Sequence, residues 1–149
     1  MTDKTKGNVL VALQFILIAM ILLMASDEVN VPWIYFGGVL FIAPGIIILF
    51  ISIKQLGTSL TANPVPREKG KLVETGIYKF VRHPIYTGLL LATLGSCVQS
   101  MAPVKFFVWL LLLALLTYKS HFEESLLKKK YSTYTDYMKR TGRFVPRLK

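Results

Sequence analysis

The sequence has little charge and almost no cysteine. Only 17% of its 149 residues are charged, 53% are hydrophobic, and the mean hydropathy is +0.50. A soluble domain would have about a quarter of its residues charged, so this composition is typical of a membrane protein. Cys97 is the only cysteine, which excludes an intrachain disulfide scaffold, and the apolar content excludes general disorder.

The sequence also lacks the motifs of several function classes. It has neither alternating strands and helices nor a GxGxxG fingerprint, which disfavours a cytosolic dinucleotide-binding enzyme. No ionisable residue lies deep in an apolar run, which argues against a pump or a channel. His121 has no metal-ligand spacing around it, so no metal is expected. No aromatic platform accompanies the basic residues, so no nucleic acid partner is expected.

Four apolar runs are present, at residues 8–25, 31–53, 85–101 and 104–118. About 20 residues cross a bilayer, and about 17 is the usual lower limit. The runs therefore predict an all-α fold in a single domain, residues 1–149. This fold would be a multi-pass membrane bundle of four transmembrane helices with a cytosolic C-terminal helical segment.

The fourth run is short for a membrane span. Lys105 near its start can extend to the interface, and the helix is expected to continue past Tyr118. Residues 100–103 form a tight turn in this interpretation, so the third and fourth spans should make a helical hairpin.

The first run has a second interpretation, which is a cleaved signal peptide. Lys4 and Lys6 precede it and Ala25 follows it, as in such peptides. The run is long, however, and Leu23 is a poor residue two places before the cleavage position. A membrane span is the preferred interpretation.

The net charge of +10 is unevenly distributed along the chain. Of the 18 basic residues, 17 fall on one side of the predicted spans. Only Lys105 lies on the other side, together with Asp27 and Glu28. The positive-inside rule then puts both termini and residues 54–84 in the cytoplasm, at the plasma or inner membrane of a prokaryote or the endoplasmic reticulum of a eukaryote. The same basic residues favour contact with anionic membrane lipid.

Polar residues gather in a first segment, residues 63–88. Pro84 suits the first turn of the third span and keeps His83 out of the helical region. The His83 ring, the Tyr86 hydroxyl and the first free N–H groups of the helix should then share one region that suits a carboxylate. The alternative is that His83 and Arg82 are only interfacial anchors.

A second polar segment covers residues 119–146. Two adjacent carboxylates, Glu123 and Glu124, cannot both face water-poor surroundings cheaply. We expect one to point to solvent and the other into a site, where a ligand ammonium group would pair with it. The alternative is a solvated pair that balances residues 128–130. Arg143 could lie against an acidic group.

Tyrosines recur every three residues in the same segment, at Tyr131, Tyr134 and Tyr137. This stripe is typical of an interfacial aromatic belt that lies on lipid.

Together these motifs resemble the isoprenylcysteine carboxyl methyltransferase family and its phospholipid methyltransferase relatives. The matching stretches are residues 72–78 and 82–88, then Glu123-Glu124 with Leu127, and finally the residues from Tyr131 to Pro146. They occur in order over residues 57–147, about two thirds of the chain.

The resemblance implies an integral membrane methyltransferase that uses S-adenosyl-L-methionine. The cofactor would lie in a cytosol-facing pocket closed by the C-terminal segment, and a lipophilic methyl acceptor would enter from the bilayer. The implied catalytic residues are His83, Tyr86 and Glu123. The implied cofactor contacts are Asn63, Gly70, Lys71, Leu72, Val73, Tyr78, His83, Pro84, Ile85, Tyr86 and Glu123.

One position departs from the family pattern. Lys119 matches a site where the prenylcysteine enzymes carry a substrate-side arginine, so it is the implied substrate-binding residue. A lysine offers a point charge where an arginine offers a two-pronged fork.

The implied reaction is most like carboxyl methylation of an isoprenylcysteine or a related thiol or carboxylate. Glu123 would hold the cofactor ammonium, whereas His83, Tyr86 and the helix N-terminus would hold its carboxylate. Three alternatives remain open. They are a phospholipid N-methyltransferase, a reductase-like relative with a nicotinamide cofactor, and a non-catalytic membrane scaffold.

Overall fold

The computed structural model describes residues 2–25 and 31–147. Asp27, Glu28 and Lys149, whose side of the membrane was inferred from charge, lie outside these residues. The described chain is helical, and its one bridge outside the helices joins Val81 to Gly142. The elements are α1 (Asp3–Leu23), α2 (Pro32–Leu56), η1 (Gly57–Ser59), η2 (Gly76–Lys79), α3 (Pro84–Ser100), α4 (Pro103–Lys130) and α5 (Tyr134–Arg140).

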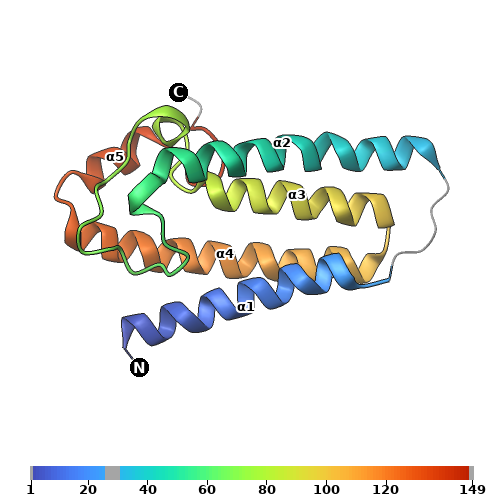
Figure 1. Ribbon diagram of the computed structural model, residues 1–149, viewed down its shortest axis with the longest axis horizontal. Helices are drawn as coiled ribbons and strands as arrows, with labels where there is room; N and C mark the ends of the chain where they lie inside the picture. The colour runs from blue at the N-terminus through green and yellow to red at the C-terminus, as the bar shows by residue number, and fades with distance from the viewer. Residues whose placement is uncertain (1, 26–30, 148–149) are drawn as a thin grey trace.

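The four long helices run side by side along the long axis, with α3 between α2 and α4 and with α1 alongside α4 (Figure 1). The segment between α2 and α3 lies together with α5 at one end of this bundle. We call residues 57–83 together with 131–147 the cap. The N-terminal end of α1 lies toward the same end.

Three helical stretches are long and apolar enough to cross a membrane, namely Asp3–Leu23, Pro32–Ser59 and Pro103–Lys130. The helix α3 has 17 residues, at the lower limit for a span. The all-α prediction is therefore confirmed for the described residues, whereas the number of membrane crossings stays a prediction.

The predicted hairpin between the third and fourth apolar runs is present. Met101, in the left-handed region with φ of 48°, ends α3, and Pro103 begins α4. The helix α4 continues past Tyr118 to Lys130, as expected. Lys105 differs from expectation, because it is 2% exposed and packs within the protein.

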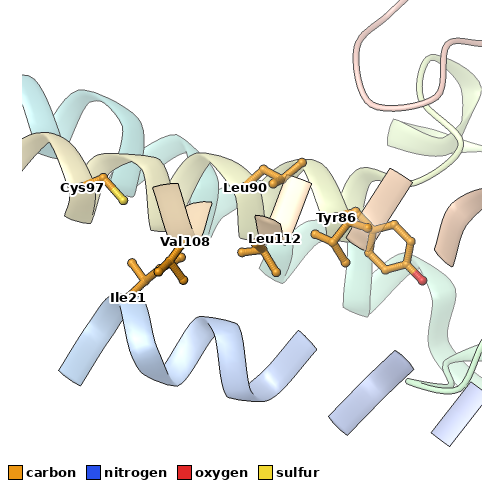
Figure 2. Close-up of a cluster of buried hydrophobic side chains, with 7 residues drawn as sticks. Ile21, Tyr86, Leu90, Cys97, Val108 and Leu112 are labelled. Carbon is orange, nitrogen blue, oxygen red and sulfur yellow. The ribbon is translucent and has the colours of Figure 1, made fainter. Parts of the chain in front are cut away.

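The buried core lies where α1, α3 and α4 meet (Figure 2). It consists of Ile21, Tyr86, Leu90, Cys97, Val108, Leu112 and Leu116. Large apolar side chains of α2 face outward instead, among them Leu40 (75% exposed) and Phe50 (71% exposed). Outward apolar side chains on a long helix fit a lipid environment.

Glycines bring α2 and α3 into backbone contact. A Cβ at Gly45 would lie 2.6 Å from the Ala92 nitrogen, and one at Gly38 would lie 2.6 Å from the Gly95 carbonyl oxygen. Helices in a membrane associate through such close packing, because burial of apolar surface gives little driving force there. The contact fixes α3, whose first turn carries the predicted site.

We expect Gly45→Ala to destabilise the bundle by about 1–3 kcal/mol, since the added methyl group overpacks a backbone contact. Gly37→Ala is the matched control, because a Cβ there would meet only Val98 Cγ1, at 3.7 Å. Thermal unfolding in detergent should give a lower midpoint for Gly45→Ala alone. Equal midpoints for the two variants would contradict the proposed contact.

Candidate functional site

The C-terminal segment is fastened beside the residues that precede α3. The backbone N–H of Arg82 donates to Gly142 O at 2.9 Å, that of His83 donates to Arg143 O at 3.0 Å, and Gly142 N–H donates to Phe80 O at 3.0 Å. The hydroxyl of Thr87 donates to the carbonyl of Phe144 at 2.6 Å. These bonds carry the end of the chain back onto the start of α3.

A buried carboxylate joins these two segments to α4. Glu124 is 3% exposed, and its Oε1 lies 2.9 Å from Arg82 Nε and 3.2 Å from His83 Nε2. Its Oε2 accepts from Arg143 Nη2 at 2.8 Å. The expectation that Arg143 could lie against an acidic group is confirmed. Arg82 also donates to the carbonyls of Met138 and Thr141.

The neighbouring carboxylate belongs to a second group of side chains. Glu123 Oε2 accepts from the Tyr86 hydroxyl at 2.8 Å and lies 3.7 Å from His83 Nδ1. The rings of His83 and Tyr86 are stacked, with centroids 5.2 Å apart and planes 2° from parallel. The start of α3 and the acidic end of α4 therefore meet.

The expectation that one of the two glutamates points to solvent is wrong. Successive side chains on a helix point about 100° apart, so one segment packed against α4 could cover only one of the two glutamates. Here the start of α3 covers Glu123, and the fastened C-terminal segment covers Glu124. The side chains are 26% and 4% exposed, respectively.

A cavity of about 370 Å³ opens beside Glu123, between α1, α2, α3, α4 and the cap. Ten of the eleven implied cofactor contacts line it, and so does Lys119. These ten are Gly70, Lys71, Leu72, Val73, Tyr78, His83, Pro84, Ile85, Tyr86 and Glu123.

Asn63 is the exception, because it is turned away toward α1. Its side-chain oxygen accepts the Val65 N–H at 2.9 Å, and its amide nitrogen donates to Asn8 Oδ1 at 2.7 Å and to Lys4 O at 3.3 Å. A turn of this kind uses the asparagine to satisfy the local backbone. Asn63 is therefore corrected from a cavity residue to a contact between the cap and α1.

The tyrosine stripe also differs from expectation. Tyr134 and Tyr137 are 1% and 3% exposed, and all three tyrosines line the cavity. The Tyr131 hydroxyl donates to Gly70 O and the Tyr137 hydroxyl to Tyr78 O, both at 2.6 Å. The interfacial-belt interpretation is wrong because the irregular cap leaves carbonyl groups that need donors, and phenols supply them.

Burial keeps the phenols of Tyr137 and Tyr78 in their donor form. It raises the pKa of Tyr137 above its ordinary value, and burial followed by the charge of Glu123 does the same to the pKa of Tyr78. Both side chains are therefore neutral over the physiological pH range.

Lys119 lies in the cavity wall one turn before Glu123. Its ammonium donates to Gln14 Oε1 of α1 at 2.6 Å and lies 5.2 Å from the centroid of the Tyr86 ring. Gln14 also lines the cavity, and sequence reasoning did not include it in the site. The sequence could have pointed to Gln14, because it is the one strongly polar side chain inside the first apolar run.

The cavity thus offers one carboxylate, Glu123, and several basic side chains within mostly apolar walls. Within residues 2–25 and 31–147, no three His, Cys, Asp or Glu side chains are grouped to hold a metal. His121 contacts Arg143, with Nδ1 3.2 Å from Nη2. Such a site can bind a small molecule that carries charges of both signs.

Known proteins resemble this chain over most of its length. The family model of phospholipid methyltransferases matches residues 33–134, from the start of α2 to the start of α5. Protein-S-isoprenylcysteine O-methyltransferase B of Arabidopsis thaliana is 29% identical over 109 residues. That alignment covers 68% of this chain and 55% of the plant protein, so the chain spans about half the length of this relative.

The buried network around Glu124 should be essential for stability. We expect Glu124→Gln to lower the free energy of unfolding by about 3–5 kcal/mol, since it leaves buried cations without their counter-charge. Asp136→Asn is the control, because its pair with Lys139 is exposed (74% and 73%) and should contribute nothing measurable. Thermal unfolding in detergent checks both variants, and an unchanged midpoint for Glu124→Gln would contradict this role.

Proposed function

We propose, from the premise that this chain belongs to the phospholipid methyltransferase family, that it methylates a lipophilic acceptor with S-adenosyl-L-methionine. The acceptor is most like the carboxylate of an isoprenylcysteine, or a related thiol or carboxylate. The observation that carries the proposal is the pairing of the α3 start with Glu123 at the wall of the cavity.

The residues of the cavity fit this cofactor in size and charge. Its volume of about 370 Å³ falls in the usual range of small-molecule sites, about 300–1,000 Å³. Glu123 has only Tyr86 and, at 3.7 Å, His83 as partners among the described residues. A ligand ammonium would complete the pairing of this carboxylate, whereas Glu124 already pairs with the guanidinium groups of Arg82 and Arg143.

In this proposal, different residues of the cavity bind different parts of the cofactor. Glu123 holds the ammonium group, and the first N–H groups of α3, with His83, hold the cofactor carboxylate. Leu72, Val73 and Ile85 flank the adenine. The Tyr86 hydroxyl is committed to Glu123, so Tyr86 orients this carboxylate rather than binding the cofactor carboxylate.

The cofactor supplies a methyl group already activated on a sulfonium, so the protein's contribution is binding and alignment. The apolar side chains Phe15, Leu49 and Ile53 line the same cavity and exclude water from it. A carboxylate or thiolate acceptor needs no proton removed.

The membrane topology belongs to the same proposal. Four crossings with both termini in the cytoplasm would put the cap, with Lys69, Lys79 and Arg140, on the cytoplasmic side, as the positive-inside rule favours. The cavity would then be open to a soluble cofactor from the cap and to a lipid from the bundle.

A phospholipid N-methyltransferase is the second candidate, because the matching family model is described by phospholipid methylation. Such a reaction would need a group that accepts the proton of an ammonium acceptor. Glu123 is the carboxylate in the cavity that could do so.

Glu123→Gln should weaken binding of S-adenosyl-L-methionine by about 2–5 kcal/mol, the usual effect of removing one partner of a buried charge pair. Isothermal titration of the detergent-solubilised protein measures this affinity. Glu74→Gln is the control, since Glu74 pairs with Arg140 away from the cavity. An unchanged affinity in Glu123→Gln would refute the assignment, and wild-type protein that binds NADPH instead would favour the reductase-like alternative.

The two acceptor classes can be separated by where a labelled methyl group is found. A lipid and membrane-protein extract is incubated with the protein and methyl-labelled cofactor. A carboxyl methyl ester releases labelled methanol in alkali, whereas a methylated amine headgroup keeps its label. We expect alkali-labile label, and label retained in the lipid headgroup would support the phospholipid reaction.

A further inference from the structure

Lys119 is a buried cation without a carboxylate partner. It is 1% exposed, and its hydrogen bond goes to the neutral amide of Gln14. No described acidic oxygen lies within ion-pairing distance of its ammonium. A buried charge is normally paired, and Lys119 has two further N–H donors that no described residue accepts. The nearest carboxylate on its own helix, Glu123, acts on Lys119 from one turn away and does not contact it, so a ligand anion could make the direct contact.

This cation is separate from the group that would hold the cofactor ammonium. Lys119 precedes Glu123 by one helical turn on the same face of α4, farther from the cap. It is bounded by Tyr86 on one side and by α1 on the other. Glu123 is the acidic residue of the lining, and Lys119 is the basic residue of the lining that lies beside α1.

Resting on the proposed function, we propose that Gln14 is a positioning residue that makes the acceptor subsite selective for an anionic group. It fixes the Lys119 ammonium by a hydrogen bond and leaves its charge free to bind the acceptor. A glutamate at position 14 would hold the Lys119 ammonium equally well, but its carboxylate would neutralise the charge of that ammonium. The acceptor's anion is a carboxylate or a phosphate next to a lipid chain.

Gln14 comes from α1, which the matched residues 33–134 do not include. The side chain is 6% exposed and sits among apolar neighbours such as Phe15. A polar side chain in an apolar helix must find a partner within the bundle, and this one finds it at the cavity. The first helix therefore contributes to the site as well as to packing.

Matched ligand pairs test the selectivity without methyl transfer. The first pair is N-acetyl-S-farnesylcysteine and its neutral carboxamide, and the second is farnesyl phosphate and farnesol. Affinities are measured on the detergent-solubilised protein by isothermal titration. We expect wild-type protein to prefer the anionic member of at least one pair by tenfold or more, and the pair that responds identifies carboxylate or phosphate.

Two variants distinguish an effect of charge on anion binding from an effect on folding. Gln14→Glu should keep the unfolding midpoint, because it replaces one partner of Lys119 by another, yet it should abolish the anion preference. Lys119→Arg should retain the preference. In the methylation assay, Gln14→Glu should raise KM for the anionic acceptor at least tenfold and leave kcat and the affinity for S-adenosyl-L-methionine within twofold.

Equal binding of the anionic and neutral members of both pairs to wild-type protein would overturn the inference. So would an anion preference that survives in Gln14→Glu, or a loss of S-adenosyl-L-methionine affinity in that variant. The proposed function fails separately, when wild-type protein does not bind S-adenosyl-L-methionine. The ligand-pair measurement does not use S-adenosyl-L-methionine, so its result can be interpreted whether or not the protein binds this cofactor.

Discussion

The buried carboxylate of Glu124 holds the cap against the helix bundle, and the geometry of the site depends on it. Its partners Arg82 and His83 precede α3, and its partner Arg143 comes from the end of the chain. The carboxylate and the two guanidinium groups would each be costly to bury alone, so together they favour one arrangement of these three segments. That arrangement fixes the His83 ring, which contacts both glutamates, and with it the wall of the cavity.

The helix α4 sets the spacing of the charges. It runs without interruption from Pro103 to Lys130, so Lys119 and Glu123 are one turn apart on the cavity face, and Glu124 is rotated by about 100° into the cap contact. Adjacent carboxylates thus perform different tasks. Glu124 pairs with the guanidinium groups of Arg82 and Arg143 and joins the cap to α4, whereas Glu123 accepts a hydrogen bond from the Tyr86 phenol and lines the cavity.

Much of this arrangement could be predicted from local sequence. Apolar runs predicted the helices and their hairpin, and Pro84 predicted the start of α3 with His83 just outside it. The meeting of His83 with Glu123 also followed, because both lie at the ends of apolar runs on the same side. The tyrosine stripe could not be read correctly, since the direction of Tyr131 and Tyr137 depends on cap carbonyls contributed by a segment distant in sequence.

The placement of α1 depends on the same kind of long-range polar contact. Near its start, Asn8 accepts a hydrogen bond from Asn63 of the cap, and two turns further along Gln14 accepts one from Lys119. Two such bonds determine both the rotation of α1 and its position along α4, which apolar packing alone would leave less defined. The family resemblance implied a cofactor contact for Asn63, and sequence reasoning left Gln14 out of the site, because hydrogen-bond partners across the bundle are invisible in either segment alone. A single bond to Lys119 therefore both positions α1 and fixes a lysine side chain in the cavity wall.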